Sequence, residues 1–132
     1  MAFDVLVVDD SPVTRKMVRR AIALIGVEIG EVREAGDGAE ALALLRAQPA
    51  HLVLADVNMP VMTGIELVER MAADPSLARI PVVVLATPLS EDRRRRLHEA
   101  GARAFLAKPF RPEALRDVLA GILGADGRGT DG

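Results

Sequence analysis

Short apolar runs alternate with segments of helical hydrophobic spacing along most of this 132-residue chain. A continuous apolar run, such as VLVV at 5–8, is typical of a strand that is covered on both faces. Four such runs and one weaker candidate predict strands at 5–8, 31–35, 52–55, 81–86 and 103–107. Each is followed by a segment with helical spacing. Strands that alternate with helices predict a parallel sheet with helices on both faces.

Capping residues indicate where the helices begin and end. Ser11 followed by Pro12 is a favoured start, because the hydroxyl caps the first turn and proline lacks an N–H that would have no partner there. Ser90 is expected to open the fourth helix. Gly26 and Gly101 are expected to end the first and the fourth helix.

The first helix carries a set of apolar residues on one face. Val13, Met17, Ala21 and Leu24 follow one another at spacings of four, four and three residues. This spacing is typical of the side of a helix that packs against a core. Met17 is therefore interpreted as a packing residue.

Right-handed crossovers leave few ways to connect five strand–helix units. The leading prediction is an α/β, flavodoxin-like fold with a five-stranded parallel sheet in the order 2-1-3-4-5. In such folds ligands bind at the carboxyl ends of the strands, where the order reverses between the first and the third strand. We expect one domain over residues 1–123 and a flexible, glycine-rich tail over 124–132.

Composition excludes several classes of function. The absence of cysteine rules out disulfides, thiol catalysis and cysteine-bound metals. Three phenylalanines are the only aromatic residues, so stacking platforms for nucleic acid are lacking, and the net charge of −2 gives no strong attraction to polyanions. Four arginines at 93–96 would spread around a helix and make no single basic stripe. With no apolar run long enough to cross a bilayer, we expect a cytoplasmic protein that binds neither nucleic acid nor membrane.

Polar residues follow the predicted strands at one edge of the sheet. Asp9 and Asp10 follow the first strand, Asp56 and then Asn58 follow the third, and Lys108 follows the fifth. Three carboxylates that converge cannot all stay ionised without compensation. An all-oxygen ligand set with room for water favours Mg²⁺. We expect Asp10 and Asp56 to be direct ligands, Asp9 to act through water, and Asn58 to offer its backbone carbonyl.

One of these carboxylates would be free to attack phosphorus, since aspartate forms acyl phosphates in known enzymes. Asp56 is the candidate, because it follows the central strand between the acidic pair and Lys108. The metal would offset charge during transfer, and Lys108 would supply a point charge to the phosphoryl oxygens.

Three segments carry a specific resemblance: VLVVDDS, LVLADVNMPVMTG around Asp56, and AFLAKPF around Lys108. Over residues 3 to about 123, the chain resembles the receiver domain of bacterial two-component response regulators, in particular the single-domain, chemotaxis-type regulators. The resemblance implies a histidine kinase or histidine phosphotransfer protein as phosphodonor. It also implies site residues: Asp56 as phosphoacceptor, Asp9, Asp10, Asp56 and Asn58 around Mg²⁺, Lys108 as phosphate contact and Phe105 as aromatic switch.

The chain departs from the family at the end of the fourth strand, where a serine or threonine hydroxyl normally contacts the phosphoryl group. Counting without gaps from Asp56 and from Lys108 reaches Ala86, and Thr87 is one residue later. Either the site lacks its hydroxyl, or a bulge lets Thr87 serve as the catalytic and switch residue. A missing bond to a charged group would cost about 1.5–3 kcal/mol and would weaken the coupling from phosphate to surface.

The resemblance favours a phosphorylation-dependent switch rather than an enzyme. It implies a monomer or weak dimer. It also implies an output surface formed by the fourth helix, the fifth strand and the fifth helix. Three alternatives remain open. A receiver used only for docking would explain Ala86. An Asp-nucleophile phosphohydrolase would need a second acid where Asn58 stands. A flavin or nucleotide binder would need a phosphate-binding loop where Asp9 and Asp10 stand.

Overall fold

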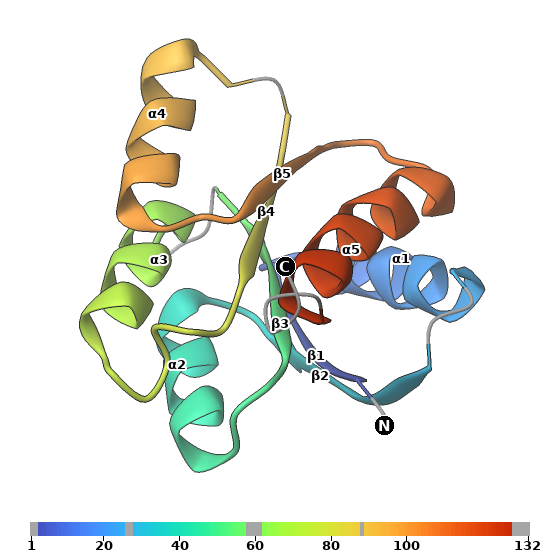
Figure 1. The fold of residues 1–132 in the computed structure, drawn as a ribbon, viewed down its shortest axis with the longest axis horizontal. Helices are drawn as coiled ribbons and strands as arrows, with labels where there is room; N and C mark the ends of the chain where they lie inside the picture. Colours follow the sequence, from blue (N-terminus) through green and yellow to red (C-terminus); the bar gives the residue numbers. More distant parts are fainter. Residues whose placement is uncertain (1–2, 26–27, 58–61, 88, 128–132) are drawn as a thin grey trace.

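The computed structural model describes residues 3–25, 28–57, 62–87 and 89–127, with side chains as far as Ile122. The chain forms a five-stranded sheet whose described strand pairs are all parallel. In sequence order the strands are β1 (Phe3–Val8), β2 (Ile29–Ala35), β3 (Leu52–Asp56), β4 (Val82–Ala86) and β5 (Ala104–Ala107). Their spatial order is β2-β1-β3-β4-β5 (Figure 1). The predicted fold class and strand order are confirmed.

In the described part of the chain, five helices cover the two faces of this sheet. They are α1 (Pro12–Leu24), α2 (Gly38–Ala47), α3 (Gly64–Ala73), α4 (Glu91–Ala100) and α5 (Pro112–Gly127). α1 and α5 lie on one face and α2, α3 and α4 lie on the other (Figure 1). Among the described helices, none combines the length and the apolar composition that a membrane span requires.

The strands are buried on both sides because their side chains alternate between two cores. In β1, Val5 and Val7 pack in the core beneath α1 and α5, while Leu6 and Val8 pack in the core beneath α2 and α3. The continuous apolar run that predicted the strand is therefore the consequence of helices on both faces.

Ser11 and Ser90, the residues predicted to cap the first and the fourth helix, are the N-caps of α1 and α4. The Ser11 hydroxyl accepts a hydrogen bond from the Thr14 N–H at 3.2 Å, and the Ser90 hydroxyl accepts one from the Arg93 N–H at 3.2 Å. Gly101 ends α4 with a φ of 123°, a conformation that favours glycine. The other glycine expected to end a helix, Gly26, lies outside the described residues.

Several boundaries differ from the sequence-based expectation: β1 begins at Phe3, two residues earlier than predicted, and β3, β4 and β5 each differ by one residue at one end. β2 begins at Ile29, two residues earlier than predicted, and its register against β1 shifts between Phe3 and Val5. α5 continues to Gly127, although a tail was expected from residue 124. The flexibility expected of residues 124–132 stays a prediction.

The prediction that α1 packs through Val13, Met17, Ala21 and Leu24 is wrong for three of the four. Val13, Met17 and Leu24 are exposed, whereas Ala21 is buried. The buried face of α1 is instead formed by Val18, Ala21 and Ile22. Both sets have helical spacing, so α1 carries two neighbouring apolar stripes, and only one of them faces the sheet.

Candidate functional site

The carboxyl ends of β1 and β3 bring three aspartates together. Val8 of β1 is paired with Ala55 of β3, so the residues that follow each of them stand side by side. Asp9, Asp10 and Asp56 each offer a carboxylate oxygen, and these three atoms lie within 4.8 Å of one another. This is the point at which the strand order reverses, where ligands bind in sheets of this type.

Lys108 connects the two buried acids of the cluster. Its ammonium Nζ lies 3.0 Å from Asp9 Oδ2 and 3.2 Å from Asp56 Oδ1. Asp9 is 1% exposed and Asp56 is 8% exposed, whereas Asp10 is exposed to solvent. The other Asp9 oxygen, Oδ1, accepts a hydrogen bond from the Ser11 N–H at 2.9 Å. Buried carboxylates need such partners to remain charged.

The pKa of Lys108 is set by opposing effects. Burial lowers the pKa, since it disfavours the charged ammonium, but hydrogen bonds and charges of Asp9 and Asp56 outweigh burial and raise the pKa above its usual value. Lys108 is therefore a permanent cation at neutral pH.

The donor set fits a hard divalent cation. All three side chains offer carboxylate oxygens, and the exposure of Asp10 leaves room for water on one side. Lys108 offsets one of the three negative charges, and a divalent cation would offset the other two. Asn58, the predicted carbonyl ligand, lies outside the described residues.

The start of α3 fixes the backbone just after Asp56. The Gly64 N–H donates to the Val57 carbonyl at 2.9 Å. A Cβ added at Gly64 would lie 2.6 Å from the Asp56 carbonyl oxygen, so only glycine permits this close approach. The Thr63 hydroxyl and the Glu66 carboxylate form a capping box that begins the helix.

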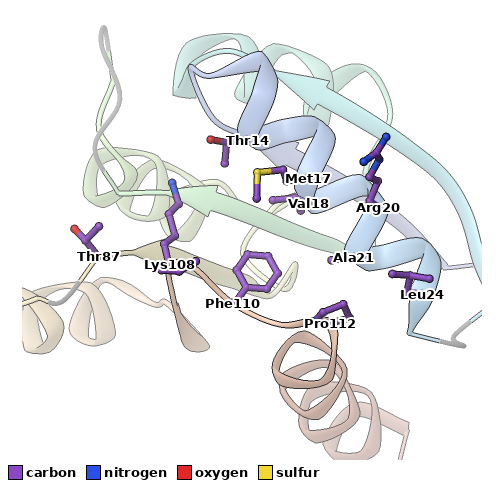
Figure 2. A pocket seen from close by; sticks show the side chains of 11 residues that line it. Thr14, Met17, Val18, Arg20, Ala21, Leu24, Thr87, Lys108, Phe110 and Pro112 are labelled. Carbon is purple, nitrogen blue, oxygen red and sulfur yellow. The ribbon is translucent and has the colours of Figure 1, made fainter.

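The end of β4 places Ala86, not Thr87, at the strand-end position. Ala86 is paired with Ala107, and its carbonyl accepts a hydrogen bond from the Lys108 N–H at 2.8 Å. The described β4 pairs run without a register shift, so they contain no bulge. Ala86 is buried, whereas Thr87 is exposed and borders the same groove as Lys108 (Figure 2).

Phe105 lies half-buried on β5, close to the end of β4. The Arg94 guanidinium of α4 stands over its ring, 5.1 Å from the centroid, which is a cation–π contact. Ala86, Thr87 and Phe105 line a cavity of about 160 Å³. The three predicted switch residues therefore border one small space between β4, β5 and α4.

A larger groove that the sequence did not indicate runs from Lys108 along α1 (Figure 2). It has a volume of about 480 Å³ and is mostly apolar. Met17 and Leu24 line it and are 60% and 71% exposed. The opposite wall is formed by Phe110, which lies between β5 and α5, and by Pro112, the first residue of α5. The available signal was the second apolar stripe of α1.

Known proteins resemble this chain over nearly its whole length. The response regulator receiver domain matches residues 5–120. Chemotaxis protein CheY1 of Helicobacter pylori is 33% identical over 122 residues, which cover 92% of this chain and 97% of that protein. A chemotaxis protein CheY homolog of Campylobacter jejuni is 32% identical over 120 residues, covering 90% and 91%.

A solved structure shows the same resemblance. The structure of chemotaxis protein CheY4 of Vibrio cholerae has a TM-score of 0.84 and 36% sequence identity, covering 93% of this chain and all of that chain. The residues matched by the family, 5–120, include the ends of β1, β3 and β5, where the three aspartates and Lys108 meet. From its sequence and its fold together, the chain belongs to the response regulator receiver domain family of two-component signal transduction.

Proposed function

We propose that this protein accepts a phosphoryl group on Asp56 from a phosphohistidine protein, with Mg²⁺ bound by Asp9, Asp10 and Asp56. The observation that carries the proposal is the position of Lys108, whose ammonium lies between the buried carboxylates of Asp9 and Asp56. A cation held there can follow the charge from the carboxylate to an incoming phosphoryl oxygen.

In this reaction an Asp56 carboxylate oxygen attacks phosphorus. The P–N bond to the donor histidine breaks, its electron pair stays on the imidazole nitrogen, and that nitrogen takes a proton from solvent. The product is an acyl phosphate on Asp56. Mg²⁺, when bound, would neutralise negative charge on the acids and the phosphoryl oxygens. Lys108 exchanges its contact with Asp56 for one with a phosphoryl oxygen.

Treatment with a small-molecule phosphodonor and Mg²⁺, followed by intact mass, tests the proposal. We expect a gain of one phosphoryl group that is lost in Asp56→Asn and on chelation of the metal. Labelling that survives Asp56→Asn would move the acceptor elsewhere. Steady turnover of phosphate esters would instead favour a phosphohydrolase.

The groove beside α1 supports a docking site for the phosphodonor. The donor histidine must come within bonding distance of Asp56, so the surface that holds the donor must border the site. The groove meets this requirement because Lys108 and Thr87 line its near end, while exposed Met17 and Leu24 line its length. A histidine kinase or histidine phosphotransfer protein with an apolar helix face would fit it. Such phosphotransfer takes place in the cytoplasm, where we place the protein.

For the output surface we propose the face of α4, β5 and α5. Phe105 and Arg94 join α4 to β5 on this face, and the cavity beside them borders Ala86. Because Ala86 has no hydroxyl, the phosphoryl group has one contact fewer with which to shift this surface between two states. A state that is monomeric or weakly dimeric stays a prediction.

A receiver that docks a partner without phosphorylation is the second candidate, and Ala86 is the observation in its favour. The two candidates differ in one measurement. A docking module would bind its partner equally well before and after phosphorylation, whereas a switch would bind with different affinities.

A further inference from the structure

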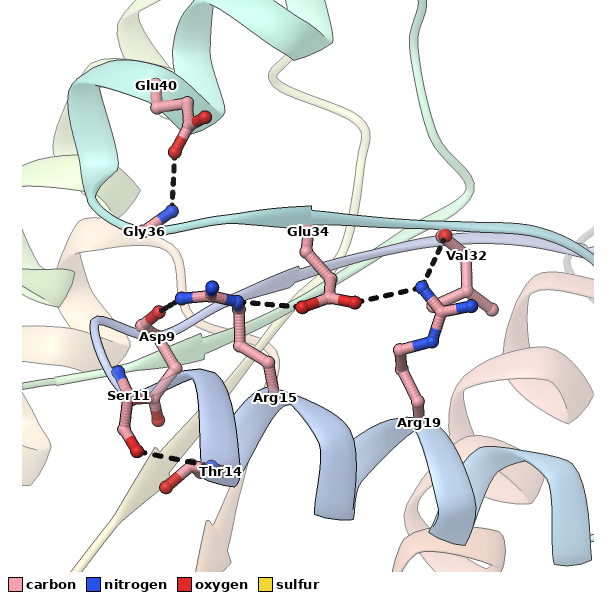
Figure 3. Close-up of polar contacts among 9 residues, drawn as sticks. All are labelled: Asp9, Ser11, Thr14, Arg15, Arg19, Val32, Glu34, Gly36 and Glu40. Carbon is pink, nitrogen blue, oxygen red and sulfur yellow. Dashed lines mark hydrogen bonds and ion pairs between the residues drawn. The ribbon is translucent and has the colours of Figure 1, made fainter.

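A chain of polar contacts ties the loop of the acidic pair to α1 and β2 (Figure 3). Arg15, on α1, donates through Nη1 to the backbone carbonyl of Asp9 at 2.6 Å. The same guanidinium donates through Nε to Glu34 Oε1 of β2 at 2.8 Å. One side chain therefore connects the site loop, a helix and a strand.

The second carboxylate oxygen of Glu34 has a different partner. Arg19 donates through Nη1 to Glu34 Oε2 at 2.9 Å and to the Val32 carbonyl at 3.3 Å. Both of these acceptors belong to β2 and not to the Asp9–Asp10 loop. Arg15 is also the more buried of the two, with 19% of its side chain exposed against 47% for Arg19.

The Asp9 carbonyl belongs to the peptide group that joins Asp9 to Asp10. The rest of Asp9 is held on other sides, since its N–H donates to the Ala35 carbonyl at 3.0 Å and its Oδ1 accepts from Ser11. With its carbonyl held by Arg15, the plane of the following peptide is fixed. That plane determines where the exposed Asp10 projects relative to Asp9.

The choice of acceptor preserves the charge of the site. Arg15 binds a backbone carbonyl of the acid loop and spends its second contact on Glu34, a carboxylate outside the cluster. Glu34 is well suited to this, because the hydrogen bond from Arg15, opposed by partial burial, keeps the pKa of that carboxyl below its usual value. Arg15 can therefore orient the acids without competing with a metal cation for their carboxylates.

We propose that Arg15 is a positioning residue for the Mg²⁺ site: it fixes the Asp9–Asp10 peptide so that both carboxylates face the same cation. This inference rests on the proposed function, because it assumes that the acidic cluster binds Mg²⁺. Residues that orient metal ligands typically contribute about 10–100-fold to metal affinity.

The test compares Arg15→Met with Arg19→Met, using Mg²⁺ alone as the probe. Both variants lose an ion pair with the same Glu34, so both lose stability, but only Arg15→Met loses the bond to the site loop. Calorimetric titration of the whole chain measures the Mg²⁺ dissociation constant. We expect about tenfold weaker binding or more in Arg15→Met, and a change within about twofold in Arg19→Met.

A second readout separates positioning from general damage. If Arg15 acts through metal affinity, saturating Mg²⁺ restores the phosphorylation rate of Arg15→Met, and a rate that stays low at saturation overturns the proposal. Equal Mg²⁺ affinities of the two folded variants also overturn it. Should Arg15→Met fail to fold, Arg15→Lys decides, because it keeps the charge without the fork of two donors. Mg²⁺ affinity then must fall below that of wild type, and an unchanged affinity overturns the inference.

The failure of the proposed function gives a different result. Wild-type protein that neither binds Mg²⁺ nor takes up a phosphoryl group contradicts the phosphoacceptor role itself. Wild-type protein that does both, with Arg15→Met indistinguishable from Arg19→Met, contradicts only the role of Arg15.

Discussion

The ammonium of Lys108, at the end of β5, lies 3.0 Å from a carboxylate oxygen of Asp9, at the end of β1. The two residues are 99 positions apart in the sequence, and the parallel sheet brings them together. Their ion pair is partly buried, which makes the loss of either partner costly. The same ammonium reaches Asp56, so one cation holds the two buried acids of the site.

The crowded carboxylates predict a trade between stability and metal binding. Asp10→Asn removes one of three like charges whose oxygens lie within 4.8 Å. Without Mg²⁺ we expect this variant to be more stable than wild type by about 1 kcal/mol, because repulsion with Asp9 and Asp56 is relieved. Added Mg²⁺ should raise the melting temperature of wild type progressively and leave that of Asp10→Asn nearly unchanged, as measured by thermal unfolding. A wild-type melting temperature that does not respond to Mg²⁺ would argue against a metal site.

At Gly64 even one added methyl group is expected to disturb the site. Gly64→Ala places a Cβ 2.6 Å from the Asp56 carbonyl oxygen, so the backbone has to move. We expect a loss of about 1–3 kcal/mol in the free energy of unfolding, measured by urea denaturation, and weaker Mg²⁺ binding. Gly121→Ala is the matched control, since nothing lies within 4 Å of its added Cβ. In helix α5 that change should stabilise by up to about 1 kcal/mol. Equal effects of the two substitutions would refute the account of Gly64.

If the groove docks the phosphodonor, a substitution in it should slow phosphorylation by a protein donor but not by a small-molecule donor. Met17→Glu introduces a charge into an apolar docking surface, so phosphotransfer from a phosphohistidine protein should slow by about tenfold or more. Phosphorylation by a small-molecule donor should stay unchanged, because the variant keeps the three aspartates and Lys108. Val13→Glu is the control, since Val13 is exposed on the same helix but does not line the groove. If Val13→Glu slowed transfer as much as Met17→Glu, the effect would be one of charge alone.

The alanine at the end of β4 predicts that coupling can be strengthened by substitution. Ala86→Ser restores a hydroxyl beside the site without adding much volume, and Ala86 borders the cavity next to Phe105. We expect the added hydroxyl to strengthen the coupling between phosphorylation and the position of Phe105 by about 1 kcal/mol. Phosphorylation should then shift the NMR signals of Phe105 more in Ala86→Ser than in wild type. Thr87→Ala is the comparison. A loss of coupling in Thr87→Ala, with no gain in Ala86→Ser, would assign the switch to Thr87.

Much of the site follows from the sequence because of one geometric rule. Residues that follow parallel strands meet at one edge, so Asp9, Asp56 and Lys108 could be brought together from their positions after apolar runs. The parallel sheet followed from the alternation of strands and helices, and the strand order was the leading prediction among the few topologies that right-handed crossovers allow. Both inferences depend on patterns within short segments, which a single sequence displays.

What the sequence did not reveal depends on contacts between segments. α1 has two apolar stripes, and only the packed structure decides that Val18 and Ile22 face the core while Met17 and Leu24 face the groove. The contact of Arg15 with the Asp9 carbonyl depends on the local path of the backbone, which no side-chain pattern encodes. The weak strand signal of β2 hid its early start for a related reason, because its middle is only partly buried.

The most direct test of the central claim is the location of the phosphoryl group after treatment with a phosphodonor and Mg²⁺. Borohydride reduces an acyl phosphate to an alcohol, so reduction followed by peptide mass mapping identifies the residue that carried it. The account predicts that Asp56 alone is converted to homoserine, and that chelation of Mg²⁺ prevents the conversion. Conversion of Asp9 or Asp10, or a phosphorylated protein whose Asp56 remains intact, would contradict it.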